Sequence, residues 1–183
     1  MGSERNGEAA PGERPGPKRI TADYLRRAAL YYLERYSVPA AQLQRVLLRK
    51  VERSCRHHGQ DSQPFRATVD EVVASCVASG LVDDRRFAEA RAQSLRRKGR
   101  SARAVAAGLA TKGVERGLIA EVAAADDEAE LDAARIAARR KRLGPWSRSD
   151  RAAQRQKDIA ALARAGFSLV IARAVIDDAG EGE

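Results

Sequence analysis

Two adjacent carboxylates, Asp83 and Asp84, are the side chains of this chain that first suggest catalysis or metal binding. Paired carboxylates can hold a divalent cation or act as a general acid and base, so a metal-dependent nuclease is one hypothesis. Arg85 and Arg86 follow at once and would weaken the binding of a cation. A catalytic site also needs further acids or histidines, and no motif in the sequence supplies them.

A structural role explains the same carboxylates better. An Asp at a helix start accepts hydrogen bonds from the free N–H groups of the first turn, and it favours the positive helix end. Leu81 and Val82 precede the pair and Phe87 follows it, which is typical of a hydrophobic staple around a helix cap. We therefore expect Asp83, Asp84, Leu81 and Phe87 to start a helix rather than to catalyse a reaction.

A second group of potential ligands is Cys55, His57 and His58, with Cys76 further along the chain. Such side chains can bind zinc, but their spacing matches no common zinc pattern, and adjacent histidines rarely both reach one ion. Cys76 also fits the apolar face of a helix. Because nucleotide-binding glycine motifs are absent as well, we expect no metal and no cofactor.

The charge pattern indicates binding rather than catalysis. The chain has a net charge of +9 and a pI near 10.1, which favours nucleic acid or an acidic protein surface as partner. Two dense clusters end predicted helices: Arg96, Arg97, Lys98 and Arg100, and then Arg139, Arg140, Lys141 and Arg142. The alternative is that these cations only complement the helix dipole or keep the chain soluble. Four cations, however, exceed what a dipole of about half a charge can use.

The elements that must position these side chains are helices. Aromatic residues make up only 4% of the chain, and no stretch alternates with period two, so we expect an all-α fold of about nine helices. Pro39 onward overlays Ser101 onward with an offset of 62, and Gly113 onward overlays Gly166 onward with an offset of 53. These overlays predict tandem three-helix repeats that stack into an elongated array.

Turn signals place the repeats at residues 20–82, 83–126 and 127–178. Residues 1–19 have the composition of a disordered tail, and 179–183 of a frayed end. No apolar run is long enough to span a membrane, and two cysteines make a disulfide framework improbable, so we expect a cytoplasmic monomer. Tyr24, Tyr31, Tyr32 and Tyr36 occupy most sides of the first helix, so at least one should be exposed.

Three short segments resemble the RecX family of regulatory proteins. GLVDDRRFAEA (80–90) resembles the family's GLLDD segment, and RRKGRS, LATKGV and LIAEV follow in the family's order. ALARAGFSLVIARAVI (161–176) looks like the family's last repeat. The chain departs from the pattern in its first repeat, where residues 53–66 look inserted and the expected Lys-Gly reads Lys50-Val51.

The resemblance implies a curved array of three-helix repeats that binds the RecA recombinase filament on single-stranded DNA. It implies a regulator, not an enzyme, that modulates and mostly inhibits filament growth, ATP hydrolysis, strand exchange and co-protease activity. The resemblance supplies no catalytic residue. The eight clustered cations are therefore expected to contact the partner only because of their charge. A helical-repeat protein that binds DNA without a recombinase is the alternative.

Overall fold

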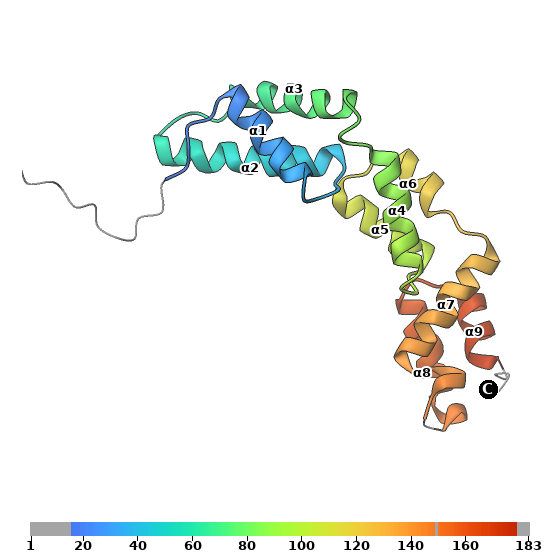
Figure 1. Ribbon diagram of the computed structural model, residues 1–183. Helices are drawn as coiled ribbons and strands as arrows, with labels where there is room; N and C mark the ends of the chain where they lie inside the picture. Colours follow the sequence, from blue (N-terminus) through green and yellow to red (C-terminus); the bar gives the residue numbers. More distant parts are fainter. Residues whose placement is uncertain (1–15, 149, 179–183) are drawn as a thin grey trace, which may run out of the picture.

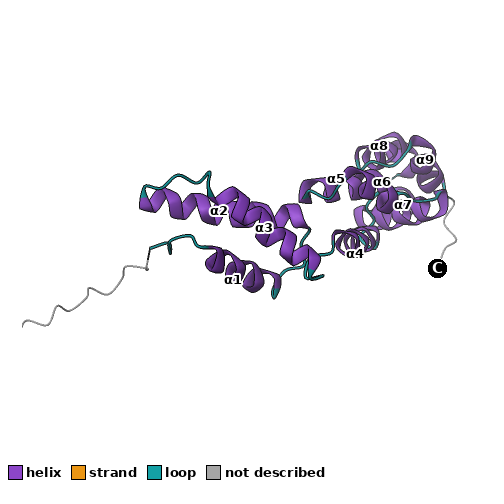
Figure 2. Cartoon of the chain, turned by 90° about the horizontal axis from the view of Figure 1, so that it is seen from above, coloured by secondary structure: helices purple, strands orange, loops and turns teal. Residues whose placement is uncertain are grey.

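The computed structural model describes residues 16–148 and 150–178 (Figure 1). Within these ranges the secondary structure consists of nine α-helices and one short 3-10 helix, with no strand, so the all-α prediction is confirmed (Figure 2). The helices are α1 (Ala22–Leu33), α2 (Ala40–His58), α3 (Phe65–Ala78), α4 (Asp84–Arg96), α5 (Ala102–Lys112), α6 (Arg116–Ala123), α7 (Asp127–Lys141), α8 (Arg151–Arg164) and α9 (Leu169–Asp177), with the 3-10 helix η1 (Gly144–Trp146) before α8.

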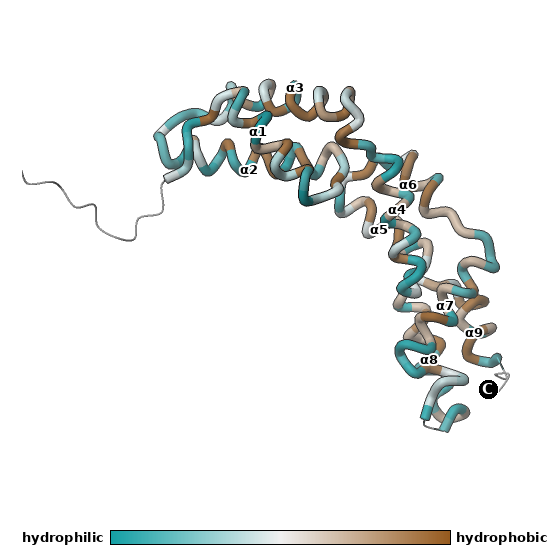
Figure 3. Tube along the Cα trace, viewed as in Figure 1, coloured by the Kyte–Doolittle hydropathy of each residue, from teal (hydrophilic) through white to brown (hydrophobic). Residues whose placement is uncertain are grey.

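The helices form three separate small cores, one for each group of three. We call α1–α3 the first unit, α4–α6 the second unit and α7–α9 the third unit. Buried apolar residues form one core within each unit. Hydrophobic and hydrophilic residues alternate along the helices of all three units (Figure 3). Four buried alanines of α7 face the third core: Ala133, Ala134, Ala137 and Ala138. Because such small side chains let helices approach closely, the units fold with few aromatic residues.

The three units follow one another in a bent row (Figure 1). The first unit forms one arm and the third unit the other, with the second unit at the bend. The main helix packing lies within units, and the most extensive pairs are α8 against α9, α2 against α3 and α7 against α9. The shape of the row therefore depends on what joins the units at the ends of their helices.

Most helices begin at a side chain that accepts a backbone N–H bond from the first turn, as at Thr21 and Ser101. Several end at a glycine with a positive φ, a conformation that costs other residues free energy. Arg142, at the end of α7, is the one non-glycine residue with positive φ in the described ranges, at 56°.

The apparent insertion at residues 53–66 lengthens a helix instead of forming a large loop. With Val51 where the second unit has Gly113, α2 continues through His58 and ends at Gly59, whose φ is 64°. Only residues 59–64 separate α2 from α3. The three helices of the first unit still share one core, which includes Val51 and Cys55 from α2.

Residues 16–19, which the sequence assigned to the tail, lie against the extended part of α2. The Ser54 hydroxyl donates to the carbonyl of Lys18 at 2.8 Å, and a ring nitrogen of His58 lies 2.7 Å from the carbonyl of Pro17. Ile20 is buried in the first core. The rest of the predicted tail, and the predicted frayed end at 179–183, lie outside the described residues.

Candidate nucleic-acid interface

The carboxylates of Asp83 and Asp84 bond to the beginnings of two different helices. Asp83 precedes α4, and its Oδ1 accepts a hydrogen bond from Arg86 N at 2.9 Å. Asp84 Oδ1 accepts from Ala40 N, 2.8 Å away at the start of α2, where Pro39 makes no side-chain cap. The pair therefore caps its own helix and joins the second unit to the first.

The expectation that Leu81 takes part in a hydrophobic staple with Phe87 is wrong. Leu81 is 53% exposed, whereas its neighbour Val82 is buried in the first core. Phe87 packs against the second core instead. The chain turns back at Gly80, whose φ is 71°, and Val82 N donates to the carbonyl of Cys76 at 3.1 Å, which brings Val82 rather than Leu81 against the first core.

Among the described residues, no group of three or more side chains is placed to hold a metal ion. Cys55 and Cys76 are both buried in the first core, and burial raises the pKa of the Cys76 thiol. His58 bonds to Pro17, and the ring of His57 packs edge-on against that of His58. The cysteines and histidines thus take structural places in the first unit.

The junction between the first and second units, which we call the first seam, is held by helix ends. Besides the Asp84 bond, Arg45 of α2 donates to the carbonyls of Lys112 and Thr111, at 2.6 Å and 3.3 Å, at the end of α5. Gly113 follows with φ 86°, and a Cβ there would lie 2.7 Å from the Cβ of Ala41. The backbone approaches so closely that only glycine fits.

The junction between the second and third units, the second seam, repeats this arrangement. The carboxylate of Glu130 on α7 accepts from Ala102 N, with its two oxygens at 3.0 and 3.2 Å. The Ser101 hydroxyl donates to the carbonyl of Ala165 at 2.9 Å. Gly166 follows with φ 100°, and a Cβ there would lie 2.5 Å from Ser101 Oγ.

The backbone groups that are bonded at the two seams lie at corresponding positions of the repeats. Ala40 and Ala102, whose N–H groups meet the carboxylates, are related by the offset of 62 in the sequence overlays. Lys112 and Ala165, whose carbonyls accept the second bond, are related by the offset of 53. The repeated units therefore also repeat the way in which they are joined.

The two basic clusters of the sequence meet at the second seam. Gly99, in the turn after α4, lies so close to α7 that a Cβ would be 2.7 Å from Ala137 N. Arg140 of α7 donates to the carbonyl of Lys98 at 3.0 Å. An open hollow of about 320 Å³ lies here, lined by Lys98, Gly99, Arg100, Ala137, Arg140, Lys141 and Ala165.

A second hollow of about 340 Å³ adjoins the first at Ala165 and adds Arg103 and Arg164 to the surface. No acidic side chain lines either hollow. We call the six cations around these hollows the seam surface: Lys98, Arg100, Arg103, Arg140, Lys141 and Arg164. Arg103 and Arg164 were not among the expected contact residues, because they lie outside the two dense clusters, and the fold brings them together at the second hollow.

The eight expected contact residues do not all remain free. Arg96 donates to the carbonyls of Val122 and Ala124, at 3.2 and 2.5 Å, and so closes the end of α6 onto α4. Arg140 is bonded to Lys98 O but still lines the hollow. The other six side chains are exposed: Arg97, Lys98, Arg100, Arg139, Lys141 and Arg142.

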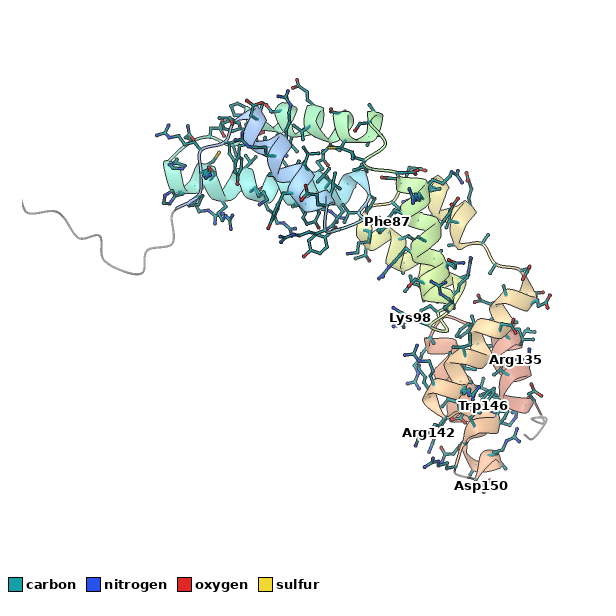
Figure 4. All side chains as sticks on the ribbon, in the orientation of Figure 1. Phe87, Lys98, Arg135, Arg142, Trp146 and Asp150 are labelled. Atoms are coloured by element: carbon teal, nitrogen blue, oxygen red, sulfur yellow. The ribbon has the colours of Figure 1, made fainter. Side chains whose placement is uncertain are left out.

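These exposed cations do not all share the seam surface. Arg97 lines a different hollow of about 540 Å³ beside α6, where Glu121 and Glu89 accompany Arg85. Arg85 and Glu121 form an ion pair at 2.7 Å, which neutralises part of that hollow. Lys98 and Arg142 lie on the inner side of the bend, while Arg135 lies on the outer side (Figure 4). The inner side at the second seam is thus the most uniformly basic part of the expected interface.

In the described part of the chain, none of the helices has the length and apolar content needed to cross a membrane.

Comparison with known proteins identifies the architecture. Residues 83–122, which cover nearly all of the second unit, match the family model described as "RecX, second three-helix domain". A protein named "Regulatory protein RecX" from Myxococcus xanthus (strain DK1622) is 48% identical over 184 residues, covering 97% of this chain and 98% of the relative. Another of that name, from Agrobacterium fabrum (strain C58), is 32% identical and covers 94% of this chain and 91% of its own length. No solved structure matches the chain. The chain belongs to the RecX family of regulatory proteins.

Proposed function

We propose that this protein binds the RecA recombinase filament on single-stranded DNA and modulates it. The effect is mostly inhibition of filament growth, ATP hydrolysis, strand exchange and co-protease activity, in DNA repair, recombination and the SOS response. The proposed role is regulatory and not enzymatic, and its proposed place is the cytoplasm. Family membership is the first support for this proposal.

The observation that carries the proposal is the seam surface. Six cations from α5, α7, α8 and the turn after α4 surround two adjoining hollows whose lining contains no acid. Close cations repel one another unless an anion meets them, and phosphates or clustered carboxylates are the anions that match several cations at once. Such a surface suits a partner that combines nucleic acid with acidic protein patches.

The bent row of units supports the same function. An elongated molecule presents its contacts over a longer path than a compact one of equal mass, so it can touch several protomers of a filament (Figure 1). Lys98 and Arg142 face the inner side of the bend (Figure 4), where a cylindrical partner would lie. We expect one copy of the protein to act as a monomer along the filament.

The direct test is the rate of ATP hydrolysis by the recombinase on single-stranded DNA while this protein is titrated in. We expect the rate to fall as the protein approaches stoichiometric amounts. An unchanged rate at those amounts would contradict the proposal.

A charge variant connects that effect to the seam surface. Lys98→Ala, Arg100→Ala and Lys141→Ala together remove three exposed cations whose side chains form no hydrogen bond or ion pair with the described residues. The matched control removes three exposed arginines, one from each unit: Arg66→Ala, Arg116→Ala and Arg173→Ala. We expect the seam variant, but not the control, to need a several-fold higher concentration for the same inhibition.

The alternative function, DNA binding without a recombinase, predicts a different result with the same proteins. Binding through six to ten phosphates falls by about 10³- to 10⁵-fold between 50 and 200 mM salt. If bare DNA stays tightly bound at physiological salt while the filament adds no affinity, the alternative is correct and the recombinase proposal fails.

A further inference from the structure

The first helix exposes aromatic side chains that no core uses. Aromatic residues are scarce in this chain, yet its four tyrosines lie between residues 24 and 36. Tyr31 is 56% exposed and Tyr36 is 55% exposed, and Leu30 beside them is 46% exposed. Tyr24 and Tyr32 pack against the first core instead. The burial of apolar surface in the first unit therefore does not account for Tyr31 and Tyr36.

Both exposed rings are held on one side by a neighbour. The guanidinium carbon of Arg35 lies 4.3 Å from the centroid of the Tyr31 ring. The Tyr36 ring packs against that of Tyr32, with centroids 4.9 Å apart. A ring that is already restrained loses less conformational entropy when a ligand stacks on its other face.

Cations are interleaved with these rings. Lys18 to Tyr36 contains five basic residues and two acidic residues. Asp23 is paired with Arg26 at 3.0 Å, which leaves Glu34 as the other carboxylate of this segment. Arg27 and Arg35 are exposed, and neither forms an ion pair with a described carboxylate. The face thus combines open aromatic rings with a positive balance of charge.

We propose that the exposed Tyr31 of α1 and Tyr36 of the turn after it form a stacking site for the bases of single-stranded nucleic acid. Aromatic rings stack on bases of any sequence, while nearby cations meet the phosphates between them. Exposed tyrosines also serve in protein–protein interfaces, but binding to a protein surface would not depend on nucleic-acid bases. The turn between α1 and α2 lies on the inner side of the bend (Figure 1), as Lys98 does (Figure 4), so one strand can approach both sites.

The site is tested without any recombinase, so its outcome is independent of the proposed regulatory function. Binding is measured by fluorescence anisotropy with two labelled strands of equal length, an oligothymidylate and a strand of abasic residues. The test variant is Tyr31→Leu with Tyr36→Leu, and its partner variant is Tyr31→Phe with Tyr36→Phe. The control is Leu169→Ala with Val170→Ala, which changes exposed apolar residues of the third unit.

We expect the leucine variant to bind the thymidine strand about 5- to 150-fold more weakly, the range that one stacked base contributes. The phenylalanine variant and the third-unit control should retain the original affinity, and the abasic strand should be bound equally by all variants. Circular dichroism checks that each variant keeps its helical content.

Three results would overturn the proposal. Unchanged affinity of the leucine variant for the thymidine strand removes the role of the rings. An equal loss on the thymidine and abasic strands shows that the bases do not matter. Unchanged DNA affinity together with weakened action on a recombinase filament assigns the face to a protein partner.

Discussion

The first and second seams join successive units at corresponding backbone groups, but through different side chains. In both, a carboxylate of the later unit meets the start of the earlier unit's second helix, at Ala40 or Ala102. In both, a side chain of the earlier unit also meets a carbonyl at the end of the later unit's second helix. That side chain is Arg45 at the first seam and Ser101 at the second.

The two seams also differ in the charge of that side chain. At the first seam one nitrogen of the Arg45 guanidinium donates to two carbonyls. At the second seam the hydroxyl of Ser101, which is fully buried, makes the corresponding bond. The hydroxyl bond therefore uses no cation, although Glu130 and Arg140 also bond across this seam.

Replacing the seam glycines should have the largest effect. Gly113→Ala and Gly166→Ala each introduce a side chain at positive φ and force a contact of 2.7 Å or 2.5 Å at their seam. A left-handed conformation costs about 1–2 kcal/mol and overpacking about 1–3 kcal/mol, so each variant should lose about 2–5 kcal/mol of unfolding free energy. Urea unfolding measures this loss.

Gly80→Ala is the matched control for the glycine variants. Gly80 also has a positive φ, 71°, but a Cβ there would meet no atom within 4 Å. It should lose only the conformational part, about 1–2 kcal/mol. An equal loss at all three glycines would show that close approach at the seams is not what requires glycine.

Removing the seam carboxylates should have a smaller and local effect. Asp84→Ala opens the first seam and Glu130→Ala the second, and loss of a helix cap costs about 0.5–2 kcal/mol. Amide hydrogen exchange should become faster at Ala40 in the first variant and at Ala102 in the second. Asp83→Ala is the control, because it should instead release Arg86 N and leave both seams protected.

The smallest effect concerns an ion pair that lies within one unit. Arg155 and Asp177 of the third unit bond at 2.6 Å, and the Arg155 hydrogen bond lowers the pKa of Asp177 below its usual 3.8. A carboxyl group whose pKa is lower in the folded state adds stability at neutral pH, and that stability disappears as the pH falls through the lowered pKa. Arg155→Met should return the Asp177 pKa toward its usual value in an NMR titration.

This titration also separates the unit from the seams. The bonds of Ser101 and Glu130 should persist in Arg155→Met, because the pair joins α8 to α9 and does not cross the second seam. Faster exchange at Ala102 in this variant would show that the ion pair supports the seam as well.

Local sequence patterns were sufficient to predict the helices and the repeats. Helix starts such as Ser101, helix-ending glycines such as Gly113 and apolar spacing are local signals, and they predicted an all-α chain of about nine helices. Periodicity was less decisive at single positions. It did not distinguish Leu81 from Val82. Both are apolar residues of the same short link between helices, and only the path of the backbone decides which one faces the core.

The interface depended on contacts between distant residues, which the sequence does not record. Nothing local indicates that Asp84 bonds to Ala40, 44 positions away, or that Arg96 is engaged by the carbonyls at the end of α6. The charge clusters were visible as runs. Their meeting at one surface follows from Gly99 against Ala137, a contact across two units.

Arg142 ends α7 where glycine would be the least strained residue. At φ 56° an arginine costs about 1–2 kcal/mol that a glycine would not, and its charge lies on the inner side of the bend (Figure 4). At this position the chain has a charged residue at a cost in stability. Replacing Arg142 with glycine would therefore make the end of α7 more stable and remove one positive charge from the inner side of the bend.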